Sequence, residues 1–537
     1  MALQLDFDGV DPLTLNLVRR VCLGDLPTRA ARQFGDRIAI VDGAAEVTYR
    51  DLENRANSLA RGLLEFGLTR GDVVCGLMAN RWEFLVTFFA CAKIGAVMMP
   101  TNTGLSADDI GFQIANASPR LVVVEREFLP LLEASLAEAG ETPTVERIVV
   151  AGHAPEAVGK LPTTSFSSLI ADNSTDTVET VVEDRDVAQC LYTSGTTSRP
   201  KAVLTSHTAV MMAALSTCIQ FRHERGDGRS VFPIVLPLFH VTALNTLTLP
   251  VLLTGGTVVL HRRFDAQALR DDIAVREVTH LMLLPNMWGD FVASADGAVP
   301  GGDSVRMAIY AMAPMNEARL KQIRAVLPNA DVVLGSGQTE FTPPTVMQWP
   351  SHQWDRSGSW GAAVATADVQ IMSHDGALLG PGEQGEIVYR GSQSMQGYGN
   401  RPGANAEVFA HGWFHSGDVG YLDADGVLWF TDRVKDIVKT GGENVSSVEV
   451  ERVLLGHPAV ADCAVVGLPD NRWGEAVTAV VVATDGQTID ENDLRTHARE
   501  HLAAYKVPKQ FIVVAELPRT STGKIRKQKL REQHITP

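Results

Sequence analysis

Helical and strand patterns alternate through the first 180 residues, and this alternation restricts the fold more than any other feature of the chain. Residues 73–78 and 121–125 are short apolar runs that predict buried strands. Residues 82–94 predict a helix that ends at the following glycine, and Thr48 with Asp51 predicts the capped start of another. Because such alternation builds layers of helices over parallel strands, the sequence predicts an α/β fold with mostly parallel sheet.

The segment between residues 155 and 180 differs from its surroundings, because it is polar and rich in Ser and Thr. It predicts a surface loop. We expect a central strand after it at residues 187–192, and the apolar run at residues 210–215 predicts a helix. Strand and helix patterns continue to about residue 430, so most of the chain is expected to belong to this α/β part.

Composition and charge exclude several classes of protein. Of 537 residues, 45% are hydrophobic and 20% are charged, which excludes a disordered chain or a collagen-like fibre. The net charge of −16 disfavours nonspecific binding to nucleic acid. Residues 501–537 reverse this balance, with eight Lys or Arg against two Glu. This basic end predicts either a small separate domain that serves an anionic ligand or, more simply, a solvated basic helix.

The cysteines and the distribution of apolar residues indicate in which cellular compartment the protein is expected. The six cysteines are scattered without a Cys-x-x-Cys pair, which favours a reducing environment and disfavours a cysteine-based zinc site. The first residues lack a basic stretch followed by an apolar one, and no run of about 18 apolar residues occurs. We therefore expect a cytoplasmic protein without a signal peptide or a membrane span.

The strongest local signal is the string Tyr-Thr-Ser-Gly-Thr-Thr-Ser-Arg-Pro-Lys at residues 192–201. Its small hydroxyl side chains and glycine supply donors to anions, and Lys201 adds a positive charge. The string is not the common Gly-x-x-x-x-Gly-Lys phosphate loop, because Pro200 precedes the lysine. It nevertheless predicts a polyphosphate site, formed by Thr193, Ser194, Gly195, Thr196, Thr197 and Lys201.

This string resembles the phosphate loop of the adenylate-forming superfamily, which includes acyl-CoA synthetases, firefly luciferase and the adenylation domains of peptide synthetases. Seven further motifs follow in the order of that superfamily, at residues 237–240, 311–315, 337–340, 413–418, 432–436, 441–444 and 518–524. Each motif alone is weak or moderate, but the ordered set is specific. The chain is therefore identified as a member of the acyl-CoA synthetase branch.

The resemblance implies roles for residues that would bind ATP and magnesium. Thr339 and Glu340 would meet the phosphates and Mg²⁺, for which a carboxylate is a suitable hard ligand. Asp418 and Arg433 would hold the ribose. The adjoining nucleotide contacts would come from Ala313, Pro314, Gly337 and Gln338.

The resemblance also implies residues that act on the acid and on coenzyme A. Lys524 would bridge the attacking carboxylate and the α-phosphate, where a fixed positive charge stabilises the developing anion. Lys435 would lie at the hinge of a domain rotation. Gly441 and Gly442 would let the pantetheine arm pass close to the backbone, although a simple turn is the alternative. His240 would gate the acyl pocket.

Three positions depart from the superfamily pattern. Ser198 and Ala202 stand where glycine is usual in the phosphate loop, and Ser336 replaces a tyrosine on which adenine normally stacks. The lost stacking face is worth about 1 kcal/mol by analogy with aromatic pairs. We therefore expect weaker or differently packed adenine binding, with the phosphate contacts retained.

The expected acyl pocket is mainly apolar. By position it includes Val241, Leu284, Met287, Trp288 and Met312, with Asn245 as a polar contact. No Asp or Glu follows His240 to pair with an amino group, which disfavours amino-acid activation. The residues leave open whether the substrate is a fatty or an aryl carboxylic acid.

The sequence predicts a large N-terminal domain of mixed, largely parallel sheets with helices (residues 1–431), a hinge (432–435) and a small, mobile α+β domain (436–537). The expected activity is an ATP-dependent carboxylic acid–CoA ligase that forms acyl-AMP and pyrophosphate, then acyl-CoA and AMP, with ATP, Mg²⁺ and coenzyme A.

Several alternatives stay open. The acceptor could be a carrier protein or an amine, including a nitrite-activating diazotase. Two less favoured hypotheses for the function are a non-catalytic nucleotide-binding scaffold and a luciferase-like oxygenase. The oligomeric state is also open, a homodimer included.

Overall fold

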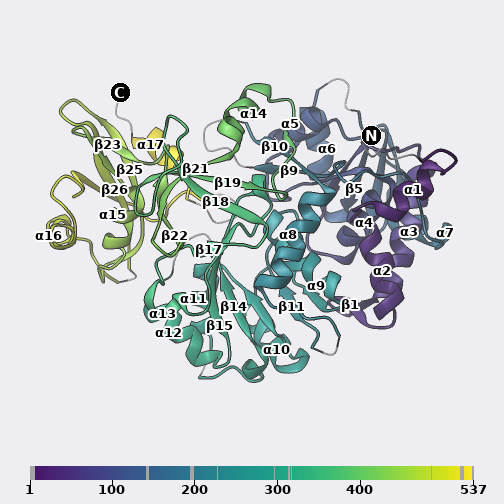
Figure 1. Cartoon of the computed structure of the whole chain (residues 1–537), viewed down its shortest axis with the longest axis horizontal. Coiled ribbons are helices and arrows are strands. Elements are labelled where there is room, and N and C mark those ends of the chain that lie inside the picture. The colour runs from purple at the N-terminus through teal and green to yellow at the C-terminus, as the bar shows by residue number, and fades with distance from the viewer. Residues whose placement is uncertain are drawn as a thin grey trace, which may run out of the picture. The chain divides into compact units, whose positions relative to one another are not determined.

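Two compact units make up the chain in the computed structural model (Figure 1). The first contains most of the chain up to Asp368 together with Arg390–Glu407, and the second contains Val369–Tyr389 and Val408 onward. The structure describes residues 7–140, 144–193, 199–226, 228–295, 297–311, 315, 317–484, 486–519 and 525–534. The boundary expected at residues 432–435 and the mobility of the last domain stay predictions.

A nine-stranded sheet forms the centre of the first unit. Its strand order is β20-β10-β9-β4-β3-β5-β6-β8-β7, and the pairs from β9 to β8 are parallel. The strands are β3 (Val73–Leu77), β4 (Val97–Pro100), β5 (Leu121–Glu125), β6 (Arg147–Ala151), β7 (Ala157–Val158), β8 (Leu161–Ser165), β9 (Val187–Thr193), β10 (Lys201–Ser206) and β20 (Gly397–Tyr398).

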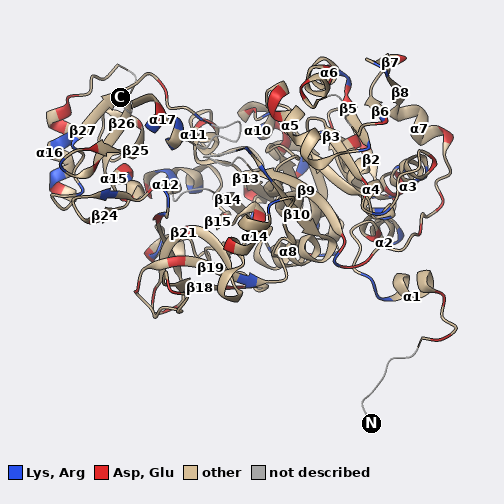
Figure 2. Ribbon diagram, turned by 90° about the horizontal axis from the view of Figure 1, so that it is seen from above, with Lys and Arg blue, Asp and Glu red and all other residues tan. Residues whose placement is uncertain are grey.

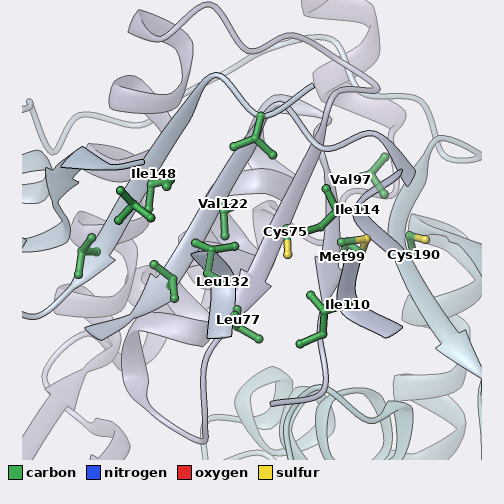
Figure 3. Close-up of a cluster of buried hydrophobic side chains, with 14 of the residues drawn as sticks. Cys75, Leu77, Val97, Met99, Ile110, Ile114, Val122, Leu132, Ile148 and Cys190 are labelled. Carbon is green, nitrogen blue, oxygen red and sulfur yellow. The ribbon is translucent and has the colours of Figure 1, made fainter. Parts of the chain in front are cut away.

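The core beside this sheet is apolar and fully buried. Cys75 of β3, Val122 of β5 and Ile148 of β6 pack with Ile114 of α5 (Ala107–Ala117) and Leu132 of α6 (Leu129–Glu138), as Figure 3 shows. Burying side chains of this kind contributes about 1.5–3 kcal/mol each, which makes the sheet a rigid support for the loops at its strand ends.

Two smaller sheets complete the first unit. One has the order β11-β12-β1-β2 and the other β13-β14-β15-β16-β17. Their strands are β1 (Ile38–Asp42), β2 (Ala45–Thr48), β11 (Val231–Ile234), β12 (Thr257–Leu260), β13 (His280–Met282), β14 (Met307–Tyr310), β15 (Asp331–Ser336), β16 (Val346–Met347) and β17 (Ala362–Ala363). The other helices include α2 (Asp25–Phe34), α3 (Tyr49–Glu65), α4 (Trp82–Ile94), α7 (Phe166–Asp172), α8 (His207–Gln220), α9 (Leu249–Thr254), α10 (Ala266–Arg276), α11 (Pro285–Ala293) and α12 (Glu317–Val326).

The second unit is built mainly from antiparallel strands, with β27 parallel to β26, and from helices that pack beside them. One sheet is β18-β19-β21-β22, and the other is β24-β23-β26-β25 with β27 beside β26. The strands are β18 (Ala367–Met372), β19 (Gly385–Gly391), β21 (Phe414–Leu422), β22 (Leu428–Arg433), β23 (Val438–Thr440), β24 (Glu443–Val445), β25 (Val460–Asp470), β26 (Gly474–Ala483) and β27 (Gln510–Val513). The helices α15 (Ser447–Leu454), α16 (Glu491–His501) and α17 (Lys527–His534) accompany the second sheet, and blue basic residues mark α16 and α17 in Figure 2.

The predicted α/β class is confirmed, and so are most of the elements predicted near the N-terminus. The side chains of Thr48 and Asp51 form the expected capping box of α3. The helix α4 ends at Gly95, whose φ of 70° is in the left-handed region that favours glycine. None of the helices among the described residues is long and apolar enough to cross a membrane.

One prediction about secondary structure is wrong. Residues 155–180 are not a loop, because they contain β7, β8 and α7. Thr163 and Thr164 pair with β6, and β-branched threonine suits a strand even in a polar segment. The helix predicted at residues 210–215 is confirmed as part of α8, and β10 lies between it and the phosphate-loop string.

All six cysteines are reduced, and five of them are buried. Burial raises the pKa of Cys22 and Cys75 to about 11, and that of Cys91, Cys190 and Cys218 to about 12. At neutral pH these thiols are therefore almost wholly protonated.

Candidate functional site

The ends of β9 and β10 frame the predicted phosphate loop. The two strands are antiparallel, and Thr193 pairs with Lys201 across their ends. Both residues are half-buried. The loop residues Ser194, Gly195, Thr196 and Thr197 lie outside the described residues, and so does Ser198. The structure therefore places the two ends of the string together.

Lys201 and Glu340 meet through a third residue, Tyr398. The Lys201 Nζ lies 4.5 Å from the centre of the Tyr398 ring, a cation–π distance. The Tyr398 hydroxyl donates to Glu340 Oε1 at 3.0 Å. Burial, and then the Glu340 charge, raise the pKa of Tyr398, so it stays a donor at neutral pH. A cation, a phenol and a carboxylate thus form one polar cluster.

Backbone pairing holds Tyr398 in this position. The short strand β20 pairs with β10, with Tyr398 opposite Val203. The Asn405 side chain accepts from the Tyr398 N–H at 2.7 Å and donates to its carbonyl at 3.0 Å. Sequence reasoning missed Tyr398, because it lies 58 residues from Glu340 and outside the quoted motifs.

The segment Gly337-Gln338-Thr339-Glu340 forms a tight turn after β15. A Cβ atom at Gly337 would lie 2.6 Å from the Cβ of Pro343, a contact that only glycine avoids. Thr339 and Glu340 begin a single 3₁₀ turn (η4, Thr339–Phe341), and the Met395 N–H donates to the Glu340 carbonyl at 2.8 Å. The turn therefore fixes the backbone of both predicted phosphate and magnesium residues.

In the second unit, Asp418 and Arg433 form the predicted pair. They are opposite each other on β21 and β22, and the Arg433 Nε lies 3.2 Å from Asp418 Oδ1. Asp418 is only 3% exposed, and its N–H donates to Ser416 Oγ at 3.0 Å. Gly417, with a φ of 72°, makes the bend before it. A buried carboxylate beside a guanidinium is suited to accept hydroxyl hydrogen bonds.

The predicted hinge and the residue that follows it carry charged side chains that bind neighbouring helices. Asp432 accepts from the hydroxyl of Ser447 in α15 at 2.8 Å, and Asp436 forms an ion pair with Arg531 of α17 at 2.9 Å. Lys435 lies between them in the sequence. Desolvation, and then the Arg433 charge, lower the pKa of Lys435.

Gly441 and Gly442 form the two-residue loop of the β23–β24 hairpin. Their φ values of 61° and 87° are left-handed, as hairpin loops of this length require. A Cβ at Gly441 would lie 2.9 Å from the Trp473 ring, whereas one at Gly442 would meet open space. The turn alone therefore explains both glycines, and their expected role toward pantetheine stays a prediction.

His240 precedes an unusual helix. Its Nδ1 lies 3.3 Å from the Thr242 N–H, and residues 242–248 form a π-helix (η2, Thr242–Thr248). π-helical turns are rare and frequently mark functional sites. The Thr246 hydroxyl donates to the Pro343 carbonyl at 2.8 Å, which connects η2 to the Gly337 turn.

Asn245 of η2 is completely buried, and among the described residues neither its Nδ2 nor its Oδ1 has a hydrogen-bond partner. Trp288 is buried as well, but its Nε1 donates to the Ile309 carbonyl and its ring packs on Phe291. Trp288 is thus a satisfied core residue, whereas Asn245 is not. The predicted site residues Ala313, Pro314 and Lys524, and Met312 of the expected acyl pocket, lie outside the described residues.

Comparison with known families explains why these residues occur together. The family described as AMP-binding enzyme matches residues 27–399, and the AMP-binding enzyme C-terminal domain matches residues 449–524. The chain belongs to the AMP-binding enzyme family. The resemblance to adenylate-forming enzymes is thereby confirmed.

Several curated relatives of this AMP-binding enzyme are CoA ligases. Feruloyl-CoA synthase from Amycolatopsis sp is 35% identical, over 96% of this chain and 100% of the relative. Long-chain-fatty-acid–CoA ligase FadD13 from Mycobacterium tuberculosis is 33% identical, over 92% and 95%. The structure of ATP-bound MatB from Rhodopseudomonas palustris superposes with a TM-score of 0.84 at 28% identity, over 95% of this chain and 99% of MatB. The AMP-binding enzyme described here is an ATP-dependent carboxylic acid–CoA ligase.

Proposed function

We propose that this ligase activates an acid that carries a hydrogen-bonding group in addition to its carboxylate. We further propose that the residues described above divide the adenylation and thioester-forming reactions between them. The buried amide of Asn245, which has no hydrogen-bond partner among the described residues, is the observation that carries the proposal for the acid.

In adenylation, Lys201 and Glu340 act on the phosphates of ATP. The carboxylate of Glu340 fits Mg²⁺, because it is a hard ligand with lone pairs beyond the one that accepts from Tyr398. Bound Mg²⁺ would neutralise phosphate charge. Lys201 adds a second positive charge, and Thr339 donates to the α-phosphate. Asp418 and Arg433 hold the ribose hydroxyls.

The carboxylate of the acid then attacks the α-phosphate, pyrophosphate leaves, and Lys524 stabilises the charge that develops between two anions. In the second reaction the thiol sulfur of coenzyme A attacks the acyl carbonyl and AMP leaves. Lys435 serves the rotation between the two reactions, Gly441 and Gly442 border the pantetheine arm, and His240 gates the acyl pocket. A homodimer and a cytoplasmic location also stay proposals.

Asn245 supports a polar acid for an energetic reason. A buried amide without partners costs about 1–3 kcal/mol for each unmade hydrogen bond, so an enzyme gains stability by replacing it. The presence of the Asn245 amide is explained if a substrate group, such as a phenolic hydroxyl or a carbonyl, forms a hydrogen bond with it. Because Asn245 has no exposed surface, we infer that η2 moves when such a substrate enters.

The experiment is a product analysis of the purified enzyme with Mg-ATP and mixed acids, with and without coenzyme A. Hydroxylated and unsubstituted benzoates, cinnamates and fatty acids are supplied as matched pairs, and nitrite with an aryl amine is run separately. We expect acyl-CoA and AMP, with the polar member of a pair preferred. Acyl-AMP that accumulates whether or not coenzyme A is present would show that coenzyme A is not the acceptor. A nitrite-dependent diazo product would show that nitrite, and not a carboxylic acid, is the substrate.

The variant Asn245→Leu tests the assignment of the amide. It removes two unpaired polar atoms at similar volume, so thermal stability should stay the same or rise. The ratio of kcat/KM for the hydroxylated acid to that for its unsubstituted partner should fall at least tenfold, because sites that hydrogen-bond a substrate hydroxyl discriminate strongly. An unchanged ratio in an active, stable variant would refute the role of Asn245 and leave the ligase activity intact.

A further inference from the structure

The helix α16 of the second unit carries a group of metal-ligating side chains apart from the residues that serve ATP. His497, Glu500 and His501 each offer one ligand atom, and these atoms lie within 4.8 Å of one another. His497 is half-buried, whereas Glu500 and His501 are exposed. Residues 497 and 501 are one helical turn apart, so the fold itself brings both imidazoles to one face.

Backbone carbonyls orient the two imidazole rings. The His497 Nε2 lies 3.0 Å from the Val453 carbonyl oxygen of α15, and the His501 Nδ1 lies 2.9 Å from the His497 carbonyl oxygen. A carbonyl can only accept, so each of these ring nitrogens carries the proton. In the neutral rings the lone pairs therefore lie on His497 Nδ1 and His501 Nε2. Metal-binding histidines are commonly held in this way by their second nitrogen.

We propose that His497, Glu500 and His501 bind a divalent transition metal, with Zn²⁺ as the best-matched ion. Two imidazoles and a carboxylate suit Zn²⁺, Ni²⁺ or Cu²⁺, whereas Mg²⁺ and Ca²⁺ prefer sets of oxygen ligands. At a Zn–N distance of about 2.1 Å, tetrahedral ligand atoms lie about 3.4 Å apart. Rotation of the exposed Glu500 side chain and small shifts of the two rings bring the ligand atoms from within 4.8 Å to this spacing, and water completes the coordination.

A neighbouring histidine is not counted as a ligand. The His457 ring centre lies 5.2 Å from that of His497, but its Nε2 is paired with Asp493 Oδ2 at 3.0 Å.

The proposal is tested by zinc titration of the full-length enzyme after treatment with a chelator, in competition with a chromophoric zinc indicator. We expect one high-affinity Zn²⁺ per chain, not displaced by millimolar Mg²⁺. His501→Ala and Glu500→Gln should each weaken binding at least tenfold. Glu491→Gln, on the exposed first turn of the same helix, and His153→Ala, an exposed histidine elsewhere, are the matched controls and should bind as the original chain does.

A second readout separates ligation from nonspecific adsorption. Because a ligand of the native state stabilises it, Zn²⁺ should raise the thermal midpoint of the original chain but not that of His501→Ala. Equal zinc affinity in the original chain and in His501→Ala, or failure of the original chain to bind zinc at micromolar concentration, would overturn the proposal. Neither outcome depends on ligase activity.

Discussion

Tyr398 connects the two charged residues of the phosphate side of the proposed site. Replacing it by phenylalanine keeps the ring beneath Lys201 but removes the hydroxyl that binds Glu340. A hydrogen bond to a charged group contributes about 1.5–3 kcal/mol, so we expect Tyr398→Phe to slow adenylation roughly 10- to 100-fold. ATP–pyrophosphate exchange measured against Mg²⁺ concentration checks this, and the Mg²⁺ needed for half-maximal rate should change.

The control for Tyr398→Phe is Tyr505→Phe, which alters an exposed tyrosine of the second unit. Its exchange rate should equal that of the unmodified enzyme. If Tyr398→Phe also exchanges at the normal rate with normal Mg²⁺ dependence, the hydroxyl has no part in adenylation.

The role of Lys524 in adenylation is assigned from its motif alone. Its test therefore measures adenylation and thioester formation separately. Lys524→Ala should lower adenylation by about 10²–10³-fold, because it removes the charge placed between two anions. Thioester formation from supplied acyl-AMP should be retained. Both rates are measured on one preparation by mass spectrometry, and equal loss of both would contradict the assignment.

At the scale of the element, the β23–β24 hairpin offers a matched pair of substitutions. Gly441→Ala and Gly442→Ala both place a side chain at a left-handed φ, which costs about 1–3 kcal/mol. Only Gly441→Ala also pushes a Cβ against the Trp473 ring. We therefore expect Gly441→Ala to lose about 1 kcal/mol or more beyond Gly442→Ala, because overpacking adds to strain. Urea unfolding of both variants measures the difference.

The same pair tests the expected passage of pantetheine. Gly442→Ala meets open space, so a strong loss of thioester formation with normal adenylation would indicate a functional requirement for glycine there. Normal rates for both reactions would leave the hairpin turn as the sole reason for Gly442.

The sequence predicts a helix or strand well when neighbouring residues determine it, and poorly when it depends on residues far away in the chain. The helix α4 and its glycine cap follow from neighbouring residues, and they form as expected. The strand β8 depends on pairing with β6, so its polar composition misled the prediction. Tyr398 reaches Glu340 only because β20 pairs with β10, and no motif records that pairing. That the amide of Asn245 has no partner within the described part of the chain likewise becomes visible only in the fold.

For the whole molecule, buried histidines predict a dependence of stability on pH. Burial lowers the pKa of His207 and His280 to about 4, and the Leu23 N–H donates to His207 Nδ1. In the unfolded chain the pKa of histidine is about 6.5, so below that pH the unfolded state binds protons first. Stability should therefore be full above about pH 6.5 and fall as the pH approaches 4, by about 3 kcal/mol for each histidine.

Urea midpoints at pH 7.5 and pH 5.0 check this pH dependence. The midpoint should be lower at pH 5.0, and His207→Gln should reduce the difference between the two. Replacing the exposed His153 by glutamine should not. Equal midpoints at the two pH values would contradict the role given to burial.

The protonated, buried thiols have a practical consequence for following the expected domain rotation. With pKa values of about 11 to 12 at five of the six positions, the native cysteines should react slowly with maleimides in the folded enzyme. A cysteine introduced at an exposed position of each unit would then take up a fluorophore selectively, without removal of any native cysteine. Energy transfer between two such dyes would report each turnover as a change in colour.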